Sequence, residues 1–192
     1  MNFLHWLKVK LLTILGDIKV YKFPFFLIYD PSTFRVKGYH TRQAMNFLKP
    51  GDIILRRYRM YLDGMFIPGK YSHTGVYVGD GKIIHAVAEG VSEIDVIDFL
   101  RCDGFCILRQ SDQNAALKAV EYVRDVLGQK GQYDFDFKDE NGSWYCHELG
   151  AKAYPDAGLE MKASRIMGFK VAPRWLAASF LECESFSKIL EV

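Results

Sequence analysis

The chain has 192 residues, and 25 Lys and Arg against 23 Asp and Glu leave a net charge of +2. This near-neutral balance gives no support to a nucleic-acid binder held by phosphate contacts. An apolar content of 49% excludes a disordered chain, and the length suits one domain with a full hydrophobic core. The four cysteines are too few for a disulfide-built mini-domain and are not spaced as paired zinc knuckles.

The first 18 residues predict an amphipathic helix, with apolar residues at helical spacing interrupted by Lys8 and Lys10. The two lysines break the apolar stretch that a signal peptide needs. The chain also lacks an apolar run of roughly 20 residues, the length that a helix needs to cross a bilayer. We therefore expect a cytoplasmic protein without a signal peptide or transmembrane helix. The favoured interpretation packs this helix on the domain. The alternative is peripheral membrane contact through residues 1–16, with both lysines at the headgroups.

Turn residues then divide the chain into short elements. Two strands and a short helix are predicted at 21–29, 34–39 and 41–47, and Lys49-Pro50-Gly51 stops the helix. We expect residues 1–48 to be an extension packed on a core domain of residues 49–192.

From Asp52 onward the pattern changes to strands, predicted at 52–57, 72–78, 82–87, 91–95 and 105–109. A helix follows, with Ser111 or Asp112 as its N-cap and Gly128 at its end. A second helix begins near Trp144, and short helical pieces are expected in residues 164–192. The fold class is α+β, a meandering antiparallel sheet with packed helices.

The segment 71–90 predicts a β-hairpin, because two apolar strands flank Gly79-Asp80-Gly81. A three-residue loop would pair Val78 with Lys82, whereas a two-residue turn at Asp80-Gly81 would move one strand's side chains to the other face. We favour the three-residue loop, since Gly79 is a poor strand residue and Gly81 suits a bulge.

The favoured register brings ionisable side chains together. His73 would lie opposite Val87, with His85 and Glu89 as its diagonal neighbours on the same face, roughly 7–8 Å away. This places a base and two groups able to orient it on one surface.

Cys146 is the candidate nucleophile, at the first turn of a helix capped by Ser143 or just before it. The unpaired N–H groups and positive dipole of such a position lower the pKa of a thiol. A cysteine nucleophile also needs a base and a group that orients the base, and His73 with His85 or Glu89 could supply them. The alternative is that Cys146 is a small buried hydrophobe.

Five segments in order carry a family resemblance: Lys49-Pro-Gly-Asp-Ile-Ile-Leu55, Tyr71-Ser-His-Thr-Gly-Val-Tyr77, Ile83-Ile-His-Ala86, Tyr133-Asp-Phe135 and Trp144-Tyr-Cys-His-Glu-Leu149. Together they resemble the permuted NlpC/P60 superfamily and, more narrowly, the YiiX/YebB-like cysteine hydrolases, which are permuted papain-like amidases. The resemblance covers residues 49–155. It implies a circularly permuted papain-like core, in which the histidine strand precedes the cysteine helix.

The resemblance assigns roles to individual residues. It implies that Cys146 is the nucleophile, His73 the base and His85 the third catalytic member, with Glu89 as the fallback. YiiX-like relatives often carry Glu at the third position, whereas lecithin:retinol acyltransferase-like relatives carry His.

Three residues around these segments are candidates for the pocket. We expect Tyr133 and Tyr71 to contact substrate. Tyr133 and Asp134 match a motif just before the nucleophile helix, where structural support is the favoured interpretation.

The implied function is hydrolysis of an amide or acyl bond through a covalent acyl-enzyme, without a cofactor or a metal. The substrate would be a peptide or a lipid. The alternatives are a lipid acyltransferase or thioesterase of the lecithin:retinol acyltransferase type, which His85 and the apolar first helix favour, and a non-catalytic binding scaffold.

Other clusters give weaker signals. A zinc site from Cys102, Cys106, Cys146 and His147 is disfavoured by its spacing, so Cys102 and Cys106 are expected to be packing residues. His147 and Glu148 are expected on the surface or in support of the helix. Arg56, Arg57 and Arg59 are interpreted as a solvated strand end, with steering of an acidic or phosphorylated substrate as the alternative.

Overall fold

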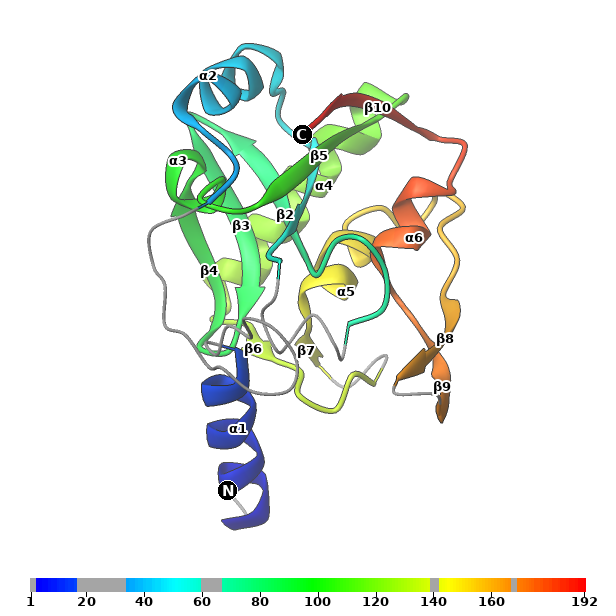
Figure 1. The fold of residues 1–192 in the computed structure, drawn as a ribbon. Helices are drawn as coiled ribbons and strands as arrows, with labels where there is room; N and C mark the ends of the chain where they lie inside the picture. The colour runs from blue at the N-terminus through cyan, green and yellow to red at the C-terminus, as the bar shows by residue number, and fades with distance from the viewer. Residues whose placement is uncertain (1–2, 17–33, 60–66, 139–141, 167–168) are drawn as a thin grey trace.

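A six-stranded antiparallel sheet forms the centre of the molecule, in the strand order β10-β5-β1-β2-β3-β4 (Figure 1). The computed structural model describes residues 3–16, 34–59, 67–138, 142–166 and 169–192. The strands are β1 (Ile53–Arg57), β2 (His73–Gly79), β3 (Lys82–Val87), β4 (Gly90–Asp95), β5 (Gly104–Gln110) and β10 (Phe186–Glu191). The predicted α+β class and the meander from β1 to β4 are confirmed.

Helices cover both faces of this sheet, because alternate strand residues face opposite sides. Ile53 and Leu55 face a core shared with α4 (Gln113–Gly128), α5 (Cys146–Lys152) and α6 (Ala177–Leu181). Ile54 faces a second core, shared with α2 (Gly38–Phe47) and α3 (Val96–Phe99). Figure 1 shows α2 and α3 on one side of the sheet and α4 and α5 on the other.

The β2–β3 hairpin has the predicted register but not the predicted loop. Gly75 pairs with His85, as the three-residue loop required, yet Lys82 pairs with Gly79 rather than with Val78. The turn is the two-residue one, with Asp80 at φ 51° and Gly81 at φ 71°, as in a type I′ turn. A bulge between Tyr77 and Gly79 then shifts the pairing by one residue, so the side chains beyond it point to the predicted face of the sheet.

The N-terminal elements differ from the prediction. The helix α1 spans Phe3–Gly16, and most of its apolar side chains are exposed rather than packed on the domain. The predicted strand at 34–39 is wrong: Val36 donates one hydrogen bond to the Cys102 carbonyl at 3.1 Å, and α2 already begins at Gly38. The strand predicted at 21–29 lies outside the described residues. No helix in the described ranges has the length and apolar content that a bilayer crossing requires.

The remaining elements are short. β6 (Gln132–Tyr133) and β7 (Ser143–Trp144) form a parallel pair, and β8 (Lys162–Ile166) pairs with β9 (Phe169–Arg174). The last third therefore contains strands as well as the expected helical piece, α6. Asp112 is the N-cap of α4, and its carboxylate accepts a hydrogen bond from the Asn114 N–H at 2.8 Å.

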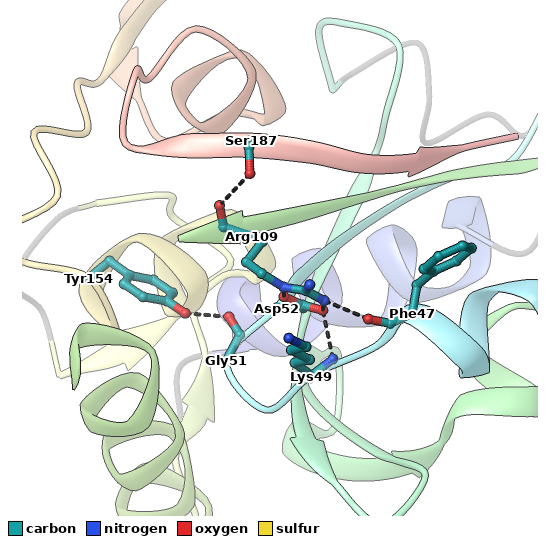
Figure 2. A network of polar contacts seen from close by, with 7 residues as sticks. All are labelled: Phe47, Lys49, Gly51, Asp52, Arg109, Tyr154 and Ser187. Atoms are coloured by element: carbon teal, nitrogen blue, oxygen red, sulfur yellow. Dashed lines mark hydrogen bonds and ion pairs between the residues drawn. The ribbon is translucent and has the colours of Figure 1, made fainter. Parts of the chain in front are cut away.

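A buried ion pair fixes the entry into β1 (Figure 2). Asp52 accepts two hydrogen bonds from the Arg109 guanidinium, at 2.8 and 2.7 Å, and one from the Lys49 N–H at 2.8 Å. The Tyr154 hydroxyl, just beyond α5, donates to the Gly51 carbonyl. The Lys-Pro-Gly-Asp segment is thus a structural clamp that joins β1 to β5 and to the end of α5.

Candidate active site

Cys146 is the first residue of α5, as the sequence predicts, although the N-cap is Tyr145 rather than Ser143. The Glu148 side chain accepts from the Tyr145 N–H at 3.4 Å and so supports this helix start. The Cys146 side chain is 4% exposed, and its sulfur lies 3.8 Å from the Ser72 carbonyl oxygen. The nucleophile candidate therefore lies against the start of β2.

Burial dominates the acidity of this thiol. Loss of hydration raises the pKa of Cys146 to about 11, although the backbone N–H groups of Thr74 and His147 act to lower it. The prediction of a lowered pKa is wrong, because desolvation of the thiolate outweighs the helix-terminal N–H groups.

The two predicted histidines meet on one face of the sheet. His73 Nε2 and His85 Nδ1 are 2.9 Å apart, and the rings are T-shaped with centroids 5.1 Å apart. Burial, followed by the nearby Arg56 cation and then His85, lowers the pKa of His73 well below its usual value. Burial and Arg56 lower the pKa of His85 to about 3. Both rings are therefore neutral at physiological pH.

The Cys146 sulfur and the His73 ring both adjoin β2 but are not hydrogen-bonded to each other. Thr74 contacts α5 through His147, and strand alternation turns His73 toward Phe99, with ring centroids 5.8 Å apart. Among the described residues, no hydrogen bond joins the Cys146 sulfur to the His73 ring. The sulfur instead lies beside the backbone from Ser72 to Thr74 that carries this histidine.

Arg56 adjoins the two histidines, although the sequence analysis interpreted it as part of a solvated strand end. It lies directly opposite His73 in the β1–β2 pairing, and its guanidinium lies 4.3 Å from the Phe99 ring centroid and donates to the Phe99 carbonyl at 3.1 Å. The interpretation as a solvated strand end is wrong for Arg56, which is half-buried, whereas Arg59 is exposed. Knowledge of the β1–β2 register would have identified Arg56 as a neighbour of His73.

A small cavity of about 20 Å³ adjoins Cys146, with room for about one water molecule. Its lining is largely aromatic and apolar: Ile67, Pro68, Tyr133, Phe137, Tyr145, Cys146, His147, Arg174, Trp175 and Leu176. The predicted pocket residue Tyr133 and the Cys146 thiol thus line the same cavity.

Two other predicted residues lie elsewhere. Tyr71 is fully buried, and its hydroxyl donates to Glu191 of β10 at 2.7 Å, so it does not line this cavity. Glu89 occupies an exposed turn between β3 and β4 rather than a strand position beside His73. Asp134 is buried and accepts from the N–H groups of Asp136 and Lys138, at 2.7 and 2.6 Å, as expected for a supporting residue.

His147 is buried rather than on the surface. Its Nδ1 hydrogen bonds with the Thr74 hydroxyl, and burial lowers its pKa to about 3. Its Nε2 and the Trp175 Nε1 are both buried without a hydrogen-bond partner, and both residues line the cavity beside Cys146. Two unused polar groups therefore adjoin the candidate nucleophile.

The other cysteines lie away from this site. The Cys102 thiol donates to the Gly104 carbonyl at 3.4 Å, and Cys106 lies in the core on β5. In the described ranges, no group of three His, Cys, Asp or Glu side chains is arranged to hold a metal ion.

Comparisons with known proteins agree with this architecture. The sequence model of the family described as "Permuted papain-like amidase enzyme, YaeF/YiiX, C92 family" matches residues 47–190, which include His73, His85 and Cys146. The fold is similar to the crystal structure of the metalloprotein YiiX from Escherichia coli O157:H7. The TM-score is 0.60 and the identity 17%, over 76% of this chain and 98% of that chain. No curated protein matches the chain.

Proposed function

The chain belongs to the permuted papain-like amidase family YaeF/YiiX (C92) and is a papain-like hydrolase, and we propose that Cys146 is its nucleophile and His73 its base. The observation that carries this proposal is the position of the Cys146 sulfur at the start of β2. There the sulfur adjoins the backbone of His73, whose ring is held by His85. Catalytic hydrogen bonds in ligand-free enzymes are often long and form only when substrate binds.

The proposed resting state has a neutral thiol and a neutral imidazole, because the pKa of Cys146 is raised and that of His73 is lowered. If His73 donates its Nε2–H to His85 Nδ1, then its Nδ1 is free to accept the thiol proton. His85 would then stabilise the resulting imidazolium through the same hydrogen bond. Activation is thus general-base catalysis during attack rather than a preformed ion pair.

Hydrolysis would proceed in two steps. The sulfur attacks the carbonyl carbon as His73 takes its proton, and the N–H groups of Thr74 and His147 beside the sulfur are candidate donors to the oxyanion. Protonated His73 then gives its proton to the leaving amine, alcohol or thiol, and an acyl-enzyme on Cys146 remains. Water, deprotonated by His73, attacks the thioester and releases the acid and the free thiol.

We also propose that the substrate carries an apolar acyl group. The cavity beside Cys146 is bordered by Phe137, Tyr145, Trp175 and Leu176. This lining favours an acyl chain or an aromatic side chain next to the reacting carbonyl, and the cavity of about 20 Å³ would have to open to admit either group. It also supports the second candidate function, thioesterase or acyltransferase chemistry on lipid-like substrates.

Turnover of an acyl ester series and of a peptide anilide, with intact-mass detection of the acyl-enzyme, tests the proposal. Cys146→Ala should abolish acylation, and His73→Ala should lower kcat/KM by about 10²–10⁴-fold, while both variants keep the melting temperature near that of wild type. His85→Phe should lower kcat, whereas Glu89→Gln should leave it unchanged.

A matched thiol control is Cys183→Ala, which should acylate like wild type. Normal turnover by Cys146→Ala would refute the nucleophile assignment. Absence of turnover and acylation in the wild type across both substrate classes would favour a binding scaffold instead.

A further inference from the structure

Exposed apolar side chains are concentrated on α1. Phe3 and Leu4 are 69% and 71% exposed, and Trp6, Leu7 and Leu11 are also exposed. Figure 1 shows α1 projecting beyond the rest of the chain, with its N-terminal end farthest away. Large apolar side chains gathered on one exposed helix indicate an interaction surface rather than ordinary surface composition.

Four of these five side chains form one stripe along the helix, and Trp6 lies about 60° outside it. At about 100° per residue, Phe3, Leu7, Leu11 and Leu4 fall within an arc of about 100°. Val9 and Leu12, which are half-buried, lie on the opposite side of the helix. The stripe is therefore the more exposed side of α1.

Lysines border the stripe on both sides. Lys8 lies about 40° beyond one edge of the arc and Lys10 about 20° beyond the other. The helix contains no Asp or Glu. Apolar residues flanked by lysines characterise helices that lie in a membrane interface, where long basic side chains reach the headgroups.

We propose that α1 binds the surface of a membrane containing anionic lipids. A second copy of the chain is a poorer occupant, because two α1 stripes packed together would bring four lysines into proximity, and α1 carries no acidic side chain to pair with them. The exposed ion pair between Lys8 and Asp136 does not prevent lipid contact, since exposed pairs contribute little and exchange readily.

Membrane binding through α1 would bring the lipid surface near the active-site region. Lys8 contacts Asp136, the residue before Phe137, which lines the cavity at Cys146. The membrane interaction itself does not depend on the proposed catalysis, so the two can fail separately.

Vesicle flotation tests the inference with the full chain. We expect binding to vesicles of phosphatidylcholine with phosphatidylglycerol, and weaker binding to phosphatidylcholine alone. The double variant Leu7→Asp/Leu11→Asp should lower the partition coefficient at least tenfold. Lys8→Gln and Lys10→Gln should each lower binding to the anionic vesicles about fivefold. A higher salt concentration should also weaken this binding.

The matched control is Leu117→Asp, which places the same charge on an exposed apolar position of α4 and should float like wild type. Melting curves will show that the variants are folded. Failure of the wild type to bind either vesicle would overturn the inference. So would binding that Leu7→Asp/Leu11→Asp leaves unchanged, or α1-dependent capture of a protein in place of lipid.

Discussion

The Cys146 thiol should be alkylated slowly at neutral pH, because burial raises its pKa to about 11. The thiolate is the reactive species, so the rate follows the thiolate fraction. An ordinary cysteine with a pKa of about 8.5 is about 3% thiolate at pH 7. A thiol with a pKa of about 11 is about 0.01% thiolate at the same pH, which gives a reduction of about 300-fold.

The shape of the pH profile separates low thiolate content from restricted access. Restricted access lowers the rate at every pH, whereas the raised pKa makes the rate rise about tenfold per pH unit through pH 9.5 without a plateau. Iodoacetamide labelling followed by peptide mass analysis gives the rate for Cys146, and the unfolded protein in denaturant gives the free-thiol reference. His73→Ala should leave the slope unchanged.

Rapid labelling of Cys146 at pH 6, with a plateau toward neutral pH that His73→Ala removes, would refute this reasoning. That result would show that His73 already holds the thiol proton in the resting enzyme. It would also show that the local N–H groups and His73 outweigh the cost of desolvation at this site.

Two further predictions concern the clamp at the start of β1. Asp52→Ala should lower the free energy of unfolding by about 3 kcal/mol, because it leaves the Arg109 guanidinium without its carboxylate partner; urea unfolding measures this, and a loss below 1 kcal/mol would contradict the clamp. Gly51→Ala should destabilise the protein more than Gly81→Ala: both have positive φ, but a Cβ at Gly51 would lie 2.6 Å from the Ala116 Cβ, whereas Gly81 has open space. Equal melting temperatures of the two glycine variants would show that the contact at Ala116 relaxes freely.

The local sequence pattern was sufficient to predict the helices and strands in which apolar residues recur at a fixed period. The strands from β1 to β5 and the helix α4 follow from alternation, helical spacing and the Asp112 cap. The pairing of Gly75 with His85 also followed, because burial of one face fixes the facing of each strand residue. The bulge that achieves this pairing was not predictable, since a three-residue loop and a two-residue turn with a bulge give the same facing.

Some features of the candidate site could likewise be predicted from the sequence, and others could not. Residue types and order in the sequence identified Cys146, His73 and His85 as candidates, and the hairpin pattern was enough to expect the two histidines together. Their environment depends on contacts between distant segments. Arg56 lies beside His73 because β1 pairs with β2. The pKa of Cys146 is raised because segments that are distant in the sequence bury its thiol.

The sequence by itself determined the α+β class, the strand and helix order and the chemical types available for catalysis, because these depend on periodicity and composition within short windows. Tertiary structure alone decided which apolar residues became core and which remained exposed. The apolar residues of α1 have the same helical spacing whether they pack on the domain or face away from it. Burial is a property of neighbours in space, and a local pattern does not specify those neighbours.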